Sequence, residues 1–431
     1  MTMARNPRVS WVISLLITIF YLSLPSYAKY GGGTGEPNNP YLIYTAEQLY
    51  DIGTNPEDWD THFKLMDDID LSNFAKFRII GRDRDNYFSG SFDGNGHVIS
   101  NLTYIRTSGI GNNIGLFGYV RSFMGKAIIK DLGLIDPNID SGGGNYVGSL
   151  IGILFDGSII DCYVKGGNIS GGDFTGGLVG ACAQVSMMTQ REIINCYCTS
   201  TISGNTYVGG LVGSYGGTIT NCNFAGNIAG YEYVGGLLGE SFNSEISNCY
   251  STGRVLGINQ VGGLVGSFMG PCTLFKSTSS SRVIGFDQVG GLVGLNIYGE
   301  IFNCYSTGSV LGISKVAGLV GVNQGTVSNC YSAGFVEGTT DVGGLVGSLD
   351  ADPFYPVGSV TNSFWDIDTS GQTTSAGGEG GTTAQMNSAS TFTEAGWDFV
   401  DETDNGTEDI WWMPEDNYPK LWWEIGDESS P

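Results

Sequence analysis

The sequence VGGLVG decides the fold of this chain, and it stands at residues 208–213, 261–266, 289–294 and 342–347. Four near-copies extend the series: VGSLIG at 147–152, TGGLVG at 175–180, VGGLLG at 234–239 and VAGLVG at 316–321. Successive copies start 28, 33, 26, 27, 28, 27 and 26 residues apart. A period of this length indicates one small structural unit that is stacked many times.

A second pattern lies within each period: an apolar residue, any residue, Asn or Asp, and then Cys, Leu or Ser. Ten copies occur between Ile99 and Ser363, seven with Asn and two with Asp at the third position. The segments around them are short, rich in Val, Ile, Tyr and Thr, and interrupted by Gly, which is typical of strands. Three short strands fit into one period, so the sequence predicts an all-β chain, a parallel β-helix of about ten coils.

Stacking puts equivalent residues of successive coils into columns. We expect the Asn side chains to form hydrogen bonds along one corner of the stack. The apolar and Cys columns are expected to face inward. Adjacent coils lie about 4.8 Å apart, which exceeds the Cβ separation of about 3.5–4.5 Å that a disulfide prefers. The nine cysteines are therefore predicted to be small buried residues without bridges.

The repeated six-residue sequence is known as the GLUG motif, and residues 99–365 resemble bacterial GLUG-repeat proteins. Residues 92–99, FDGNGHVI, are also similar to the start of a right-handed β-helix of the pectin-lyase type. The resemblance implies a right-handed parallel β-helix in an exported or surface-exposed protein, and some relatives of this kind are adhesin-like. It implies no reaction.

The first 28 residues have the composition of a signal peptide. Arg5 and Arg8 precede an apolar stretch at 9–24, and the small residues Ser26 and Ala28 predict cleavage before Lys29. An uncleaved membrane anchor is the alternative, although the stretch is short for a span. The remaining chain has 17 Lys and Arg against 43 Asp and Glu. This charge argues against nucleic acid as a partner and suits a secreted or cell-surface protein.

The composition divides the chain into four parts: a signal peptide at 1–28, an N-terminal cap with the first coils at 29–96, the GLUG-repeat β-helix at 97–365, and an acidic, Trp-rich C-terminal cap at 366–431. A stack of parallel strands exposes unpaired edges at both ends, so caps are expected there. Residues 45–52 predict a short helix, because Thr45 and Gln48 have the spacing of a capping box. The alternative for the last part is a sorting or docking tail.

Candidate catalytic residues are sparse. A glycosidase needs a pair of carboxylates, and a lyase needs carboxylates with calcium and a base. The best carboxylates are Asp67, Asp68, Asp70, Asp93, Asp366 and Asp368, which we expect in solvated turns. His62 and His97 do not form the HExxH motif of the metallopeptidases that accompany some GLUG repeats. The sequence predicts no catalytic residue, no metal site and no cofactor.

Aromatic residues directly follow the Cys column and, if the cysteines face inward, form an outward stripe. Its members are Tyr163, Tyr197, Tyr250, Tyr305, Tyr331 and Phe364. Such a stripe can stack on sugar rings, or it can stabilise the sheet by stacking on itself. Longer corners at 119–127, 181–192 and 348–359 project from one side of a solenoid. They add Phe123, Arg191, Phe354 and Tyr355 to the hypothetical binding residues.

The sequence therefore predicts a secreted or cell-surface β-solenoid that is adhesive or structural and not an enzyme. Its expected partners are glycans or surface proteins, and no membrane span is expected once the signal peptide is removed. The first alternative is a polysaccharide lyase or glycoside hydrolase on the same scaffold. The second is a passive spacer.

Overall fold

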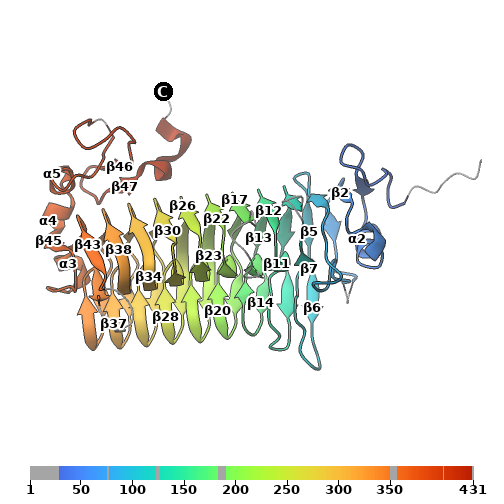
Figure 1. Ribbon diagram of the computed structural model, residues 1–431, viewed down its shortest axis with the longest axis horizontal. Helices are drawn as coiled ribbons and strands as arrows, with labels where there is room; N and C mark the ends of the chain where they lie inside the picture. The colour runs from blue at the N-terminus through green and yellow to red at the C-terminus, as the bar shows by residue number, and fades with distance from the viewer. Residues whose placement is uncertain are drawn as a thin grey trace, which may run out of the picture.

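The computed structural model describes residues 29–74, 77–122, 127–182, 191–349, 357–400 and 402–429. The proposed signal peptide and the candidate binding residues Phe123, Phe354 and Tyr355 lie outside this part. The described strands stack into a rod, a parallel β-solenoid of about ten coils (Figure 1). The predicted fold class is confirmed. Among the described residues, no helix is both long enough and apolar enough to cross a membrane.

Three sheets run along the rod, two of nineteen strands and one of seven. Sheet 1 consists of β1 (Tyr41–Ile43), β2 (His62–Leu65), β4 (Ser91–Asp93), β7 (Phe117–Val120), β8 (Ile128–Lys130), β11 (Ile151–Leu154), β12 (Gly157–Ile160), β16 (Val179–Cys182), β17 (Arg191–Ile194), β21 (Val212–Tyr215), β22 (Thr218–Thr220), β25 (Leu238–Phe242), β26 (Glu245–Ser247), β29 (Val265–Met269), β30 (Thr273–Phe275), β34 (Val293–Phe302), β38 (Val320–Ser328), β42 (Val346–Ser348) and β43 (Ser359–Thr361).

Sheet 2 consists of β3 (Ile69–Asp70), β5 (Val98–Ser100), β6 (Thr103–Ile105), β9 (Gly133–Ile135), β10 (Asn138–Asp140), β13 (Tyr163–Lys165), β14 (Asn168–Ser170), β18 (Tyr197–Cys198), β19 (Thr201–Ser203), β23 (Asn223–Ala229), β27 (Tyr250–Leu256), β31 (Thr278–Ser279), β32 (Arg282–Ile284), β35 (Tyr305–Ser306), β36 (Val310–Leu311), β39 (Tyr331–Ser332), β40 (Val336–Glu337), β44 (Phe364–Asp366) and β45 (Glu379–Gly381). Sheet 3 consists of β15 (Thr175–Gly176), β20 (Thr206–Gly209), β24 (Glu232–Gly235), β28 (Asn259–Gly262), β33 (Asp287–Gly290), β37 (Ser314–Ala317) and β41 (Thr340–Gly343).

The pairing register puts each repeat position directly above its equivalent in the next coil. Val208 pairs with Val234, which pairs with Val261, and the same column continues along sheet 3. The two valines and the leucine of the VGGLVG at 208–213 are all fully buried, so its three apolar positions face the core. The glycines of the repeated sequence let neighbouring coils approach closely, as the copy at 261–266 shows. A Cβ at Gly266 would lie 2.6 Å from the carbonyl oxygen of Gly239.

The Asn column forms the predicted ladder at the corner between sheets 1 and 2. Its ten members have positive φ: Asn101, Asp131, Asp161, Asn195, Asn221, Asn248, Lys276, Asn303, Asn329 and Asn362. Asn and Asp tolerate this left-handed conformation better than most residues, which explains their recurrence. Asn221 Nδ2 donates to Asn195 Oδ1 at 3.1 Å, and Asn248 Nδ2 donates to Asn221 Oδ1 at 3.1 Å. The expected amide ladder is confirmed.

All nine cysteines are free and buried, as predicted. The thiols of the Cys column donate to backbone carbonyls, as Cys222 Sγ does to the oxygens of Thr220 at 3.3 Å and Ile193 at 3.4 Å. Burial raises the pKa of the Cys222 thiol well above its usual value. All nine are therefore core residues, and those of the Cys column also bind the corner backbone.

The two ends of the rod carry the non-repetitive segments. At the N-terminal end, α2 (Ala46–Ile52) begins with the predicted capping box of Thr45 and Gln48, and η1 (Pro56–Asp58) follows it. At the C-terminal end, α3 (Ile367–Ser370), α4 (Thr383–Met386) and α5 (Ala389–Thr393) lie beside the last coils (Figure 1). The pair β46 (Trp411–Trp412) and β47 (Lys420–Leu421) and then η2 (Trp422–Ser429) fold back over the rod.

Candidate functional site

An aromatic ladder runs along the rod at the start of sheet 3, where Tyr207 is the second residue of β20 and Tyr233 is the second residue of β24. Tyr146, Phe174, Tyr207 and Tyr233 each stand immediately before a copy of the GLUG motif. Successive ring centroids lie 4.9, 4.6 and 4.7 Å apart, and successive ring planes are 8°, 9° and 3° from parallel. The rings are therefore stacked face to face along the rod, with their edges turned outward. We call these four residues the aromatic ladder.

The residue directly before the repeated sequence has a left-handed backbone in the aromatic coils and in later coils alike. Tyr207 has φ 59° and Tyr233 has φ 54°, and Gln260, Gln288 and Lys315 take the same conformation in later coils. The positive φ is therefore a property of this position and not of the aromatic residues. What distinguishes the four coils of the ladder is the type of side chain.

A hollow of about 410 Å³ opens between the aromatic ladder and sheet 1. Its far wall is a column of paired residues on neighbouring strands: Ile153, Ala181, Ser214 and Glu240. Ala181 and Ser214 are small, which leaves room opposite the rings. Phe242 at the end of β25 and Cys182 complete the lining. The hollow thus combines apolar walls with a few polar groups, as small-molecule sites do.

Glu240 supplies the one carboxylate among the described lining residues. Ser214 Oγ donates to Glu240 Oε2 at 2.9 Å. Burial raises the pKa of the Glu240 carboxyl above its usual value. Burial, together with the nearby Glu240 charge, raises the pKa of Tyr207 to about 12. The hollow therefore offers phenol donors and a carboxylate acceptor, which suits a ligand rich in hydroxyl groups.

The family model of the GLUG motif matches residues 143–170, 204–229, 230–256 and 288–311. Each matched segment contains one copy of the repeated sequence and the following corner Asn or Asp. The chain carries repeats of the GLUG motif. The aromatic ladder and its hollow are built on the first three matched segments and the unmatched coil that starts near Gly172, so this candidate site belongs to the GLUG repeats themselves.

Two curated relatives share part of this GLUG-repeat chain. Halomucin of Haloquadratum walsbyi is 32% identical over 156 residues, which are 35% of this chain and 2% of halomucin. A candidate Gly-rich membrane protein of Evansella cellulosilytica is 36% identical over 129 residues, which are 28% of this chain and 14% of that protein. The chain thus matches only a small part of either relative.

A solved structure, that of a candidate immunoglobulin A1 protease from Bacteroides ovatus, is 18% identical to this chain. The superposition covers 91% of this GLUG-repeat chain and 95% of the solved one, with a TM-score of 0.46.

The predicted tyrosine stripe is interrupted in the GLUG-repeat rod. Tyr163 and Tyr197 stack at 4.9 Å with planes 3° from parallel, so their faces are turned to each other. Tyr250 is exposed, and its ring centroid lies 6.1 Å from that of Trp423. Tyr305 and Tyr331 are only 5% and 1% exposed, and the expectation that they face solvent is wrong.

The C-terminal segment covers these last two tyrosines. Tyr305 Oη donates to Glu424 Oε1 at 2.6 Å, and Tyr331 Oη donates to the carbonyl oxygen of Pro419 at 2.7 Å. Indole groups fasten the same segment to the corner column. Trp397 Nε1 donates to the Asn362 carbonyl, Trp411 Nε1 to Asn303 Oδ1 and Trp423 Nε1 to the Lys276 carbonyl. The segment therefore packs directly on the GLUG coils.

Arg191 also departs from the expectation that it projects from a long corner. It is the first residue of β17, where it pairs with Gly157, and it is only 7% exposed. A buried strand position does not present its guanidinium to a large partner. Arg191 is therefore not part of a recognition edge.

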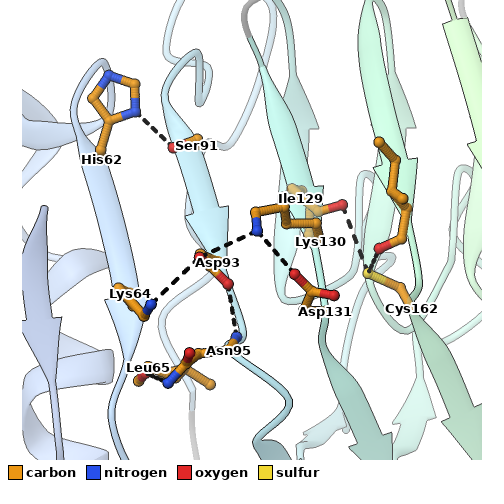
Figure 2. A network of polar contacts seen from close by, with 11 residues as sticks. His62, Lys64, Leu65, Ser91, Asp93, Asn95, Ile129, Lys130, Asp131 and Cys162 are labelled. Carbon is orange, nitrogen blue, oxygen red and sulfur yellow. Dashed lines mark hydrogen bonds and ion pairs between the residues drawn. The ribbon is translucent and has the colours of Figure 1, made fainter. Parts of the chain in front are cut away.

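The carboxylates weighed as catalytic groups hold the fold together. Figure 2 shows Asp93 between two lysines, 3.9 Å from Lys64 Nζ and 3.3 Å from Lys130 Nζ. Lys130 also donates to Asp131 at 2.9 Å. Asp68 accepts from the Val98 backbone and contacts His97 Nδ1 at 3.0 Å, and its pKa is lowered by these partners.

Asp366 has an equally structural role at the end of the rod. It accepts from the backbone of Asp368 and Thr369 at the start of α3, and from the hydroxyl groups of Thr383 and Tyr418 at 2.7 Å. Within the part of the chain that the structure describes, no group of three His, Cys, Asp or Glu side chains is placed to hold a metal ion.

Sequence reasoning followed the aromatic column behind the cysteines and missed the aromatic ladder. The signal was available, since an aromatic residue directly precedes the repeated sequence at 147, 175, 208 and 234 but not at 261, 289, 316 or 342. The opposite wall could not be found in this way, because the pairing of Ser214 with Glu240 depends on the register between coils.

Proposed function

We propose that this GLUG-repeat β-solenoid is a non-enzymatic structural and adhesive module of the cell surface or its surroundings, and that it holds glycans in the hollow beside the aromatic ladder. The observation that carries the proposal is the hollow itself, which is lined by the phenols of Tyr146 and Tyr207, the carboxylate of Glu240 and apolar side chains. The surface location is supported by the signal-like N-terminus and by the names of the two relatives.

The chemistry of the hollow favours a neutral saccharide. Sugar rings carry hydroxyl groups at their edges and C–H groups on their faces, so they need both hydrogen-bonding groups and apolar contacts. Glu240 can accept from a sugar hydroxyl, and hydrogen bonds to a charged group are stronger than neutral ones. Tyr207 Oη can donate or accept, and Phe242 and Ile153 supply apolar surface.

The stacked rings limit how the ligand binds. Because neighbouring rings cover each other's faces, a sugar meets the edges and hydroxyl groups of the ladder. The apolar face of the sugar must then pack on Phe242 or Ile153. A carboxylate pair of the kind that glycosidases use is not found among the described lining residues, which favours binding over hydrolysis.

A glycan array with the purified chain, run with and without calcium, tests the proposal. We expect selective binding of neutral oligosaccharides that is independent of calcium. Glu240→Gln and Tyr207→Phe should each weaken it about tenfold, since each removes a hydrogen bond without changing the shape of the hollow. Tyr197→Phe is the matched control, because it removes a phenol from the other stacked column.

The array has three outcomes that contradict the proposal. They are no binding at high protein concentration, binding that both hollow variants leave unchanged, and shortening of a bound polysaccharide during incubation. The last would favour the lyase or hydrolase alternative.

A further inference from the structure

Positive charge gathers at one place in this acidic protein. The chain has a formal net charge of −24, yet residues 76–130 contain eight Lys and Arg against three Asp and Glu. Three of these bases, Arg78, Arg82 and Arg106, line the same part of the rod near its N-terminal end. A local concentration of one sign of charge points to a ligand of the opposite sign.

The three arginines surround two adjoining hollows of about 540 and 410 Å³. Phe77, Arg78, Tyr104 and Arg106 are shared between the two. Tyr50 on α2 closes one side, and the chain that follows β6 closes the other. Volumes of this size are typical of small-molecule sites.

Hydrogen bonds to neutral groups orient the guanidinium groups. Arg78 Nε donates to Tyr50 Oη at 3.3 Å. Arg106 Nη1 donates to Tyr104 Oη at 3.3 Å, and its Nε donates to the Ser108 carbonyl at 3.2 Å. Arg82 lies over the ring of Trp59, 5.7 Å from the centroid. The tyrosines thus fix the direction of two arginines and also line the walls.

These arginines keep donors free for a ligand. All three are exposed, and none takes part in the ion pairs found among the described residues. Asp83, beside Arg82 in the sequence, uses its carboxylate in its own turn, where it accepts from the backbone of Asp85 and Asn86 at 3.0 and 2.9 Å.

We propose that this arginine-lined hollow binds an acidic saccharide, a sugar ring that carries a carboxylate or sulfate group. Guanidinium groups bind such anions through two parallel hydrogen bonds. Tyr50, Tyr104 and Phe77 supply apolar wall for the ring that carries the anion. The site is separate from the hollow at Glu240, and its opposite charge selects a different ligand.

The competing occupant is the acidic C-terminal segment of a second copy, since residues 350–431 contain 17 Asp and Glu and one Lys. That segment is engaged within its own chain. Glu424 accepts from Tyr305 and from the Leu421 backbone, and Trp423 binds the Lys276 carbonyl. An acidic saccharide needs no release of these contacts, so the observations favour it.

Calorimetric titration of the purified chain tests the proposal with three probes: a galacturonic acid hexasaccharide, a sulfated hexasaccharide and neutral cellohexaose. We expect at least one acidic probe to bind, and cellohexaose to leave its binding unchanged when both are present, because the neutral probe does not occupy the arginine-lined hollow. The affinity of the acidic probe should fall as salt is raised from 50 to 300 mM, because charge pairing is screened. No binding of either acidic probe, or binding of the acidic probes that does not weaken as salt is raised, would overturn the proposal.

Single variants distinguish binding in this hollow from a general attraction between the protein's arginines and an acidic probe. Arg78→Gln, Arg82→Gln and Arg106→Gln should each weaken the acidic probe about tenfold. Arg254→Gln and Arg282→Gln are matched controls, because these arginines are exposed and stand on neighbouring strands of sheet 2. Equal losses in controls and hollow variants would contradict a specific site.

Two further measurements distinguish this site from the hollow at Glu240 and from self-association. Glu240→Gln should leave binding of the acidic probe unchanged, so failure of the glycan proposal above does not decide this one. Sedimentation at low salt should show a monomer, whether or not all three arginines are replaced. An oligomer that the triple variant abolishes would assign the hollow to the C-terminal segment of a second copy and overturn the saccharide proposal.

Discussion

Tyr207 and Tyr233 lie one coil apart with ring centroids 4.7 Å from each other and ring planes 3° from parallel. The centroid distance equals the usual spacing of neighbouring strands, about 4.8 Å, because the register places each ring directly above its equivalent. Each of these two rings therefore covers one face of the other, and that face is closed to a ligand. The scaffold thus determines which parts of its aromatic residues a ligand can reach.

Glu240 should make stability depend on pH. Burial raises its pKa in the folded state above the unfolded value, which is near 4.5. Because the pKa is higher in the folded state, the protonated carboxyl stabilises the fold. This contribution to the free energy of unfolding is complete below the unfolded pKa and is lost as pH rises through the folded pKa. As pH rises from about 4 to 7, we expect the melting temperature of the natural chain to fall relative to that of Glu240→Gln, which does not titrate. A difference that stays constant over this range would contradict the buried carboxyl.

The corner ladder should be sensitive to Asn221. Asn221→Ala removes two amide hydrogen bonds and places at φ 54° a residue without the polar side chain that lets Asn tolerate this conformation. The left-handed conformation costs about 1–2 kcal/mol for such a residue, and the two bonds contribute about 1 kcal/mol together at this exposed position. We expect Asn221→Ala to lower the free energy of unfolding by about 2–3 kcal/mol in urea titrations.

Asn221→Gly separates the two effects, because glycine adopts positive φ without strain. It should lose only the hydrogen bonds and cost about 1 kcal/mol. Equal losses for Ala and Gly would show that the backbone conformation contributes nothing at this corner.

The two neighbouring tryptophans of β46 should behave differently. Trp411 is fully buried against Tyr331 and Trp397, whereas Trp412 is 38% exposed. Trp411→Ala should cost about 3–5 kcal/mol by leaving a cavity and should make the C-terminal segment sensitive to limited proteolysis. Trp412→Ala should leave the cleavage pattern unchanged. Similar proteolysis of both variants would contradict the packing of this segment.

The thiols should be inert in the folded protein. All nine are free and buried, and burial raises the pKa values of Cys182 and Cys198 to about 11. The thiolate is the reactive form, so a disulfide-type thiol reagent should react with none of them at pH 7 within minutes. It should react with all nine in denaturant without prior reduction. Fewer than nine after unfolding would reveal bridges.

The architecture was predictable because each coil repeats the same local signals. The Asn column, the buried cysteines and the capping box of Thr45 and Gln48 all follow from residue type and spacing. The inward direction of all three apolar positions in VGGLVG could not be predicted from the sequence. Val208 and Leu211 are three residues apart, so in a regular strand their side chains would point to opposite faces. The tight turn made by the intervening glycines brings both into the core.

The candidate sites were less predictable because they depend on contacts between distant residues. Tyr305 and Tyr331 follow the same pattern as Tyr163, and only the fold of the C-terminal segment buries them. The wall of Ser214 and Glu240 likewise depends on register. Arg78 and Arg106 are 28 residues apart and meet because the N-terminal coils bring α2, residues 77–82 and β6 together.

A crystal structure of the chain with the tightest neutral oligosaccharide from the array tests the central claim most directly. We predict a sugar beside Tyr207 with one hydroxyl donating to Glu240 Oε1 or Oε2 and its C–H face on Phe242 or Ile153. Density for the sugar on another face of the rod, with the hollow lined by Tyr207 and Glu240 left unoccupied, would contradict it.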